Sequence, residues 1–205
     1  MDSFLSDLLF YLRAGGWVMP PLAIATVLLW YGLGFRMAAL SRGSQESVRN
    51  LLERYGSGQF RVDGERRGVI LVALREGLDL QRRRVPDLRR HLDVAFGELE
   101  QAMGSFRVLS KTIIAVAPLL GLLGTVIGMM ETFDSLSSMQ LFSQTGGIAG
   151  GISQALITTQ FGLAIAIPGL VVHGFLERRA NRLRVDLAQM KDILCTQEGA
   201  TEVHA

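Results

Sequence analysis

The chain is poor in cysteine and histidine, which build disulfides and many metal centres and acid–base sites. Its 205 residues include one cysteine, Cys195, and three histidines. A single thiol cannot form an internal disulfide and makes a thiolate metal site a poor interpretation. The histidines fall in unrelated segments: His91, His173 and His204. With no nucleophile–base–acid set, phosphate-binding loop or metal-ligand spacing, we expect no catalytic residues, no cofactor and no metal.

Charge is also missing, over three long stretches. Residues 14–35 and 112–130 contain no Asp, Glu, Lys, Arg or His, and the only ionisable side chain of residues 135–176 is His173. An uncharged apolar run of about 18 or more residues can cross a membrane as a helix, because the hydrocarbon layer needs roughly 20 residues at about 1.5 Å each. The third stretch begins with a polar, Gly-rich part, so its spanning part is placed at residues 152–176.

Two other interpretations of these runs are weaker. A soluble all-α protein would keep a polar stripe on each core helix, whereas residues 18–35 are apolar almost all round. A cleaved signal peptide would carry a shorter apolar core after a basic start, whereas Asp2 and Asp7 precede the first run. We therefore expect the first run to remain as a membrane anchor.

The basic residues predict an orientation. Most of them lie in residues 36–111, and five more follow Leu176, but residues 131–147 contain none and carry only Glu131 and Asp134. Lys and Arg near the ends of spans stay in the cytoplasm. The N-terminus is then periplasmic and the C-terminus cytoplasmic, in a multi-pass protein. A net charge of only +2 gives no support for nucleic-acid binding.

The predicted architecture is an all-α membrane protein with three transmembrane helices, the second and third extended into a cytoplasmic helical domain. Apolar residues at spacings of three and four from Leu88 to Leu109 predict one continuous helix from about Pro86 to Met130. Long helices with an apolar stripe bury it against neighbours, so an oligomer is expected. The expected segments are a periplasmic amphipathic helix (1–15), the first span (16–37), a cytoplasmic helical segment (38–111), the second span (112–130), a periplasmic loop and helix start (131–151), the third span (152–176) and a cytoplasmic C-terminal helix (177–205).

Small residues distinguish the second and third spans from the first. Three glycines of the second span are three and four positions apart, which puts them on one face where another helix can approach closely. We predict a helix-packing role for these glycines and for one proline in each of the two spans: Gly121, Gly124, Gly128, Pro118 and Pro168.

Polar residues also gather in these two spans. The candidates for lining a narrow polar path are Thr125 in the second span and Gln154, Thr158 and Thr159 in the third. Alternatively, each hydroxyl bonds back to its own helix and only adjusts packing. The spans contain no embedded Asp, Glu, Lys or Arg, so a proton carrier would have to come from another chain.

The same residues carry a family resemblance. Residues 118–128 (PLLGLLGTVIG) resemble the core motif of the MotA/TolQ/ExbB proton channel family. Residues 150–159 (GGISQALITT) and 162–168 (GLAIAIP) are similar to its second motif, and residues 15–20 (GGWVMP) to the start of shorter ExbB-type members. The resemblance covers all three spans in order.

This resemblance implies a pentamer whose second and third spans line a central pore. A dimer of an ExbD-like single-span subunit would sit in the pore and supply the essential aspartate. The family's pore threonines fall on Thr125 and Thr159, and Gln154 stands where ExbB proteins often have a glutamate. The implied function is that of a proton-channel subunit of the bacterial inner membrane, which uses the proton motive force to drive a TonB-like protein and so powers outer-membrane uptake.

Three alternatives to this function stay open. A TolQ-like subunit would serve envelope integrity with the same architecture. A membrane scaffold would use the glycine faces only to assemble helices. A membrane enzyme is disfavoured because no catalytic set is visible.

Overall fold

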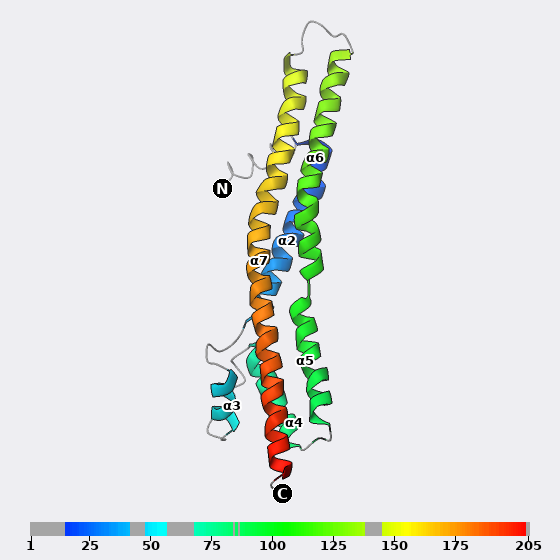
Figure 1. Ribbon diagram of the computed structural model, residues 1–205. Coiled ribbons are helices and arrows are strands. Elements are labelled where there is room, and N and C mark those ends of the chain that lie inside the picture. The colour runs from blue at the N-terminus through cyan, green and yellow to red at the C-terminus, as the bar shows by residue number, and fades with distance from the viewer. Residues whose placement is uncertain are drawn as a thin grey trace. The chain divides into compact units, whose positions relative to one another are not determined.

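The structure, a computed structural model, describes residues 15–41, 48–56, 68–83, 85, 87–137 and 145–203 (Figure 1). Throughout these ranges the regular structure is helical and no strand occurs. The elements are η1 (Gly16–Val18), α2 (Met19–Ala39), α3 (Val48–Gly56), α4 (Val69–Arg82), α5 (Leu88–Gly104), α6 (Arg107–Ser137) and α7 (Thr145–Val203). The amphipathic helix expected over residues 1–15 lies outside the described residues except for Gly15.

Three helical stretches are long and apolar enough to cross a membrane, judged by length and composition. Among the described residues they are Gly16–Ala39, Leu88–Ser137 and Ile148–Thr196. The second and third stretches are much longer than one crossing needs. The predicted fold class, with three spans of which two are extended, is therefore confirmed.

The prediction of one unbroken helix from Pro86 to Met130 is wrong. α5 ends at Gly104 and α6 begins at Arg107, and Phe106 between them has a φ of 58°. A bulky residue rarely adopts this left-handed conformation, so surrounding contacts must hold it there. One such contact is visible: the rings of Phe106 and Phe35 meet edge to face with their centroids 5.2 Å apart.

The chain divides into two compact units. The first contains residues 1–33 and 107–173, and the second contains residues 34–106 and 174–205. In the first unit α6 and the first part of α7 run alongside each other and are in close contact (Figure 1). α2 packs on this pair, where Leu29 reaches Gly169.

Glycines bring the backbones of α6 and α7 together. A Cβ atom on Gly121 would lie 3.1 Å from the carbonyl oxygen of Thr158, and one on Gly128 would lie 2.6 Å from that of Gly151. On α7, a Cβ atom at Gly162 would lie 2.8 Å from the carbonyl oxygen of Ala117. Because these neighbours are backbone atoms, a side chain could enter only if the helices moved apart.

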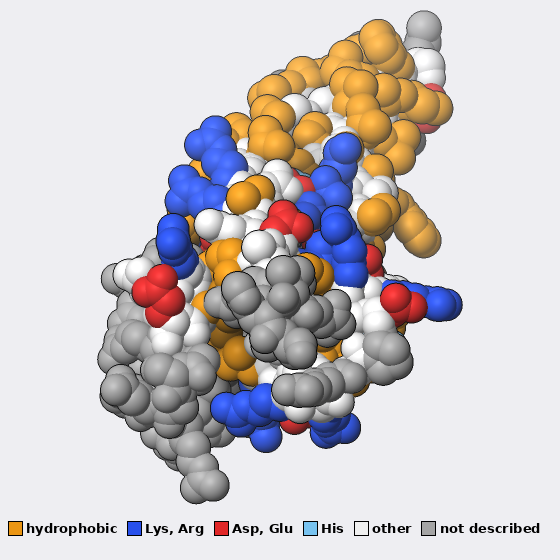
Figure 2. Space-filling view, turned by 60° about the horizontal axis from the view of Figure 1, so that its bottom comes forward, with side chains coloured by type: hydrophobic (Ala, Val, Ile, Leu, Met, Phe, Trp, Pro, Cys, Tyr) orange, Lys and Arg blue, Asp and Glu red, His pale blue; other side chains and the backbone are white. Residues whose placement is uncertain are grey.

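The outer faces of the same helices are apolar. Figure 2 shows apolar side chains dominating one region of the surface, while Lys and Arg gather in another. An apolar surface of this extent needs lipid or another protein chain to cover it. The large exposed side chains include Leu119, Leu122, Val126, Met130 and Phe133 of α6 and Leu156, Leu163, Ile167 and Leu170 of α7.

The second unit has its own core, built from α4, α5 and the second part of α7. The fully buried side chains come from all three helices: Ile70 and Leu74, Leu92, and Leu187, Met190 and Leu194. Charged groups lie around this core, including an ion pair of 2.6 Å between Lys191 and Asp93. Burial, and then the carboxylate of Glu98, raise the pKa of Glu76 on α4.

One ion pair of the second unit has a buried guanidinium. The guanidinium of Arg36, in the last turn of α2, lies 3.3 Å from the Glu177 carboxylate of α7, and their side chains are 1% and 21% exposed. Burying such a pair gives little net stability, but removing one partner leaves a charge in a site that cannot solvate it. Arg36 and Glu177 therefore constrain how α2 and α7 pack in this unit.

We predict that Glu177→Ala lowers the free energy of unfolding by about 3 kcal/mol, because the buried Arg36 guanidinium loses its carboxylate partner. The measurement is the thermal unfolding midpoint of the detergent-purified protein. Asp79→Ala is the control, since Asp79 pairs with Arg83 at an exposed position and should contribute less than about 1 kcal/mol. Equal midpoints for the two variants would contradict the prediction.

Neighbouring glycines of α7 provide a test of the helix contact. A Cβ atom on Gly151 would lie 2.6 Å from the carbonyl oxygen of Gly128, whereas one on Gly150 would meet nothing within 4 Å. Gly151→Ala should therefore destabilise the protein by about 1–3 kcal/mol. Gly150→Ala should cause no loss, because alanine favours a helix over glycine. Thermal unfolding in detergent measures both, and a tolerated Gly151→Ala would show that the contact is looser than described.

Candidate ion pathway along α6 and α7

Two threonines lie half-buried at or near the contact of α6 with α7. The hydroxyl of Thr159 donates to the carbonyl oxygen of Ala155 on its own helix at 3.1 Å, and lies 3.4 Å from that of Gly121 on α6. Thr125 is one turn from Gly121, and its hydroxyl donates to the carbonyl oxygen of Leu122 at 2.6 Å. The close approach at Gly121 therefore brings the Thr159 hydroxyl to the backbone of the other helix.

Thr158 has a different environment. Its side chain is 0% exposed and its hydroxyl donates to the carbonyl oxygens of Gln154 and Ala155. The side chain occupies the space that a Cβ atom on Gly124 would take. Within this chain, Thr158 packs α6 against α7 and its hydroxyl bonds to its own helix. This environment is typical of a packing residue rather than of one that lines a polar path.

Gln154 lies where three elements meet. Its amide nitrogen Nε2 is 3.4 Å from Oε1 of Glu131 on α6. A Cβ atom on Gly16 of η1 would lie 2.5 Å from the same nitrogen, and Gly16 has a φ of +62°. The structure thus brings Gln154 beside Glu131, which sequence reasoning did not include among the site residues. One signal was present, because Glu131 follows Gly128 by three residues and so continues the glycine face of α6.

The two prolines lie inside their helices. Pro118 of α6 is half-buried and Pro168 of α7 is exposed. Each lacks a backbone N–H and so cannot bond to the carbonyl four residues earlier, that of Ile114 or Ala164. The helix-packing role of Pro168 stays a prediction.

The polar groups of the pathway can bind water but cannot store charge between its ends. Residues 112–130 of α6 and 148–172 of α7 contain no Asp, Glu, Lys, Arg or His. Hydroxyl and amide groups can orient water molecules, and a chain of water can carry a proton, but holding it requires a titratable group. Among the described residues, no three His, Cys, Asp or Glu side chains are grouped to bind a metal.

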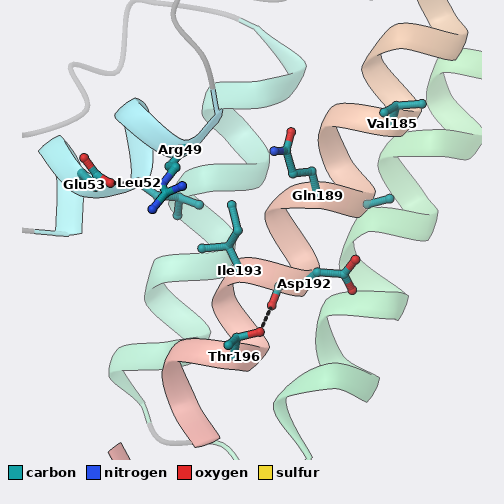
Figure 3. Close-up of a pocket in the computed structure, with 9 residues that line it drawn as sticks. Arg49, Leu52, Glu53, Val185, Gln189, Asp192, Ile193 and Thr196 are labelled. Carbon is teal, nitrogen blue, oxygen red and sulfur yellow. Dashed lines mark hydrogen bonds and ion pairs between the residues drawn. The ribbon is translucent and has the colours of Figure 1, made fainter. Parts of the chain in front are cut away.

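A groove of about 750 Å³ lies in the second unit, between α3 and the second part of α7 (Figure 3). Its polar lining includes Arg49 and Glu53 of α3 and Gln189 and Asp192 of α7. The hydroxyl of Thr196 donates to the backbone oxygen of Asp192 at 2.8 Å, and so it is not paired with a side-chain base.

A second groove, between α4 and α5, is lined by carboxylates. Its polar side chains are Glu76, Asp79, Asp87, Arg90, His91 and Glu98, and none carries a hydroxyl or thiol.

Comparison with known proteins gives a family match that includes α6 and most of α7. Residues 65–189 match the MotA/TolQ/ExbB proton channel family. An ExbB-like biopolymer transport protein of Synechocystis sp. is 48% identical over 67 residues, 32% of each chain. The Tol-Pal system protein TolQ of Haemophilus influenzae is 36% identical over 85 residues, 42% of this chain and 37% of TolQ. The biopolymer transport protein ExbB of Salmonella typhimurium is 34% identical over 79 residues, 38% of this chain and 32% of that protein.

The chain spans about a third of the length of each of these relatives. The family match covers more than half of the chain, including α4, α5, all of α6 and most of α7. The glycine contact and the threonines of the candidate pathway all lie inside the matched range. Residues 118–128 and 150–168, which carry the family resemblance, lie inside it too. This chain belongs to the MotA/TolQ/ExbB proton channel family.

Proposed function

We propose that this protein is a proton-channel subunit of a bacterial inner-membrane complex that uses the proton motive force to power TonB-dependent outer-membrane transport. The observation that supports it most is the hydroxyl of Thr159 at the carbonyl of Gly121, with Thr125 one turn away. These groups line an uncharged polar path along two closely packed helices. We assign no catalytic role to any residue.

The missing charge supports a partner subunit. Between Thr112 and Met130 of α6 nothing can hold a proton. An ExbD-like single-span subunit would supply the aspartate inside a pore formed by several copies of this chain, and a pentamer is the proposed assembly. The exposed apolar faces of α6 and α7 support this assembly, because neighbouring copies of the chain and lipid would cover them.

The orientation follows from charge. With the basic second unit in the cytoplasm, the ends of α6 and α7 that carry Glu131 and Gln154 face the periplasm. A proton that crosses about 100 mV releases roughly 2.3 kcal/mol. A few protons per step would therefore be enough to drive a movement of packed helices, which a TonB-like protein would transmit to the outer membrane.

A TolQ-like role in envelope integrity is the second candidate. The TolQ of Haemophilus influenzae and the ExbB of Salmonella typhimurium match this chain to nearly the same identity. The Gly-Gly-Trp at residues 15–17 and the short connection between α6 and α7 favour the ExbB-like role.

We predict that Thr159→Val abolishes proton flux while the complex still assembles, because valine keeps nearly the same volume but has no hydroxyl. The measurement is acidification of liposomes that contain the chain together with its single-span partner. Thr26→Val is the matched control, since Thr26 of α2 also donates to its own helix, at 2.7 Å to Leu22. A scaffold without a channel would show the same behaviour for both variants.

The two family roles predict different phenotypes for deletion of this chain. An ExbB-like subunit should support growth on iron complexes that are taken up across the outer membrane. Its loss should abolish that growth and leave resistance to detergent intact. A TolQ-like subunit should show the reverse pattern. The measurement is growth of the deletion strain on both media, with the Thr159→Val variant and the native chain supplied back.

A further inference from the structure

We propose that Glu131 is the proton-accepting acid at the outer mouth of the pathway, and that Gln154 holds its carboxylate in place. This inference rests on the proposed function and adds a residue to it. The contact that carries it joins Oε1 of Glu131 on α6 to the amide nitrogen of Gln154 on α7, 3.4 Å apart.

The Gln154 amide contacts Glu131 on the opposite helix and lies close to Gly16 of η1. Gly16 lies so close to Nε2 that a side chain at this position would displace the amide, and the positive φ of Gly16 also favours glycine. The amide N–H can only donate, so it can orient the carboxylate but cannot take its proton. Gln154 is therefore a positioning residue, and Glu131 is the group that can exchange a proton.

The contact between Glu131 and Gln154 contributes too little to the stability of the fold to explain its presence. Glu131 is exposed, and a polar contact of 3.4 Å at an exposed site contributes little to folding. A carboxylate that reaches both solvent and the polar face of α7 has the placement that proton uptake requires.

The surrounding elements contain few other groups that could take this role. Gly16–Val18 and residues 148–159 of α7 have no ionisable side chain, and the last two turns of α6 add only Asp134. Asp134 is exposed and lies three residues beyond Glu131, which makes it a matched comparison.

The proton step is simple. A hydronium ion in the periplasmic water transfers its proton to the Glu131 carboxylate, which leaves water and a neutral carboxylic acid. The acid then releases the proton to a water molecule in the pathway and becomes a carboxylate again. Gln154 is five residues from Thr159, about 7.5 Å along the helix axis, a distance that two or three water molecules span.

The test measures proton flux into liposomes that contain the chain and its single-span partner. We expect Glu131→Gln to reduce the flux by roughly tenfold or more, because the amide cannot accept the proton. Asp134→Asn should keep the native flux. The exchanged pair Glu131→Gln with Gln154→Glu restores a carboxylate to the same contact and should recover most of the flux, which a purely structural loss would not do.

Failure of this inference is distinguishable from failure of the proposed function. Suppose that the native complex conducts protons and that Thr159→Val abolishes the flux. If Glu131→Gln then leaves the flux unchanged, the role of Glu131 is overturned, whereas the proposed channel function stands. If Asp134→Asn reduces the flux as much as Glu131→Gln does, general surface charge accounts for the effect and the inference is also overturned. If the native complex conducts no protons, the proposed function itself fails.

Discussion

The contact between the backbones of α6 and α7 is the constraint on which the candidate pathway depends. Gly121 and Gly128 on one helix and Gly151 and Gly162 on the other leave no room for a side chain between them. In lipid, where apolar side chains gain nothing by meeting each other, such close approach is a main source of helix association. It also has a chemical consequence, because only at this spacing does the hydroxyl of Thr159 come within 3.4 Å of a carbonyl on the other helix.

Much of this arrangement could be predicted from the sequence. The uncharged runs predicted three spans, as many as the candidate spans among the described residues, because a charge in hydrocarbon is costly enough to leave a clear gap in the sequence. The spacing of Gly121, Gly124 and Gly128 indicated one face of a helix, and these glycines do lie toward α7 in the structure. Both signals are local, so one chain is enough to show them.

What the sequence could not predict depends on contacts between distant segments. Thr158 and Thr159 are adjacent and chemically identical, and only the position of α6 makes one a packing residue and leaves the other half-exposed. The break at Phe106 is invisible to apolar periodicity, because two residues in other conformations leave the stripe recognisable on both sides. Glu131 was interpreted only as a loop charge, since its partner Gln154 lies 23 residues away.

An uncharged path also limits what one chain can do. On the proposed function, a proton that entered past Glu131 would find no group to hold it among the hydroxyls of α6 and α7, and a free charge in a narrow apolar surrounding is unfavourable. Flux through this chain alone should therefore be very low, and an acid inserted by another subunit would remove the barrier. Conduction then depends on assembly with that subunit, so an isolated copy would not dissipate the gradient that the complex uses.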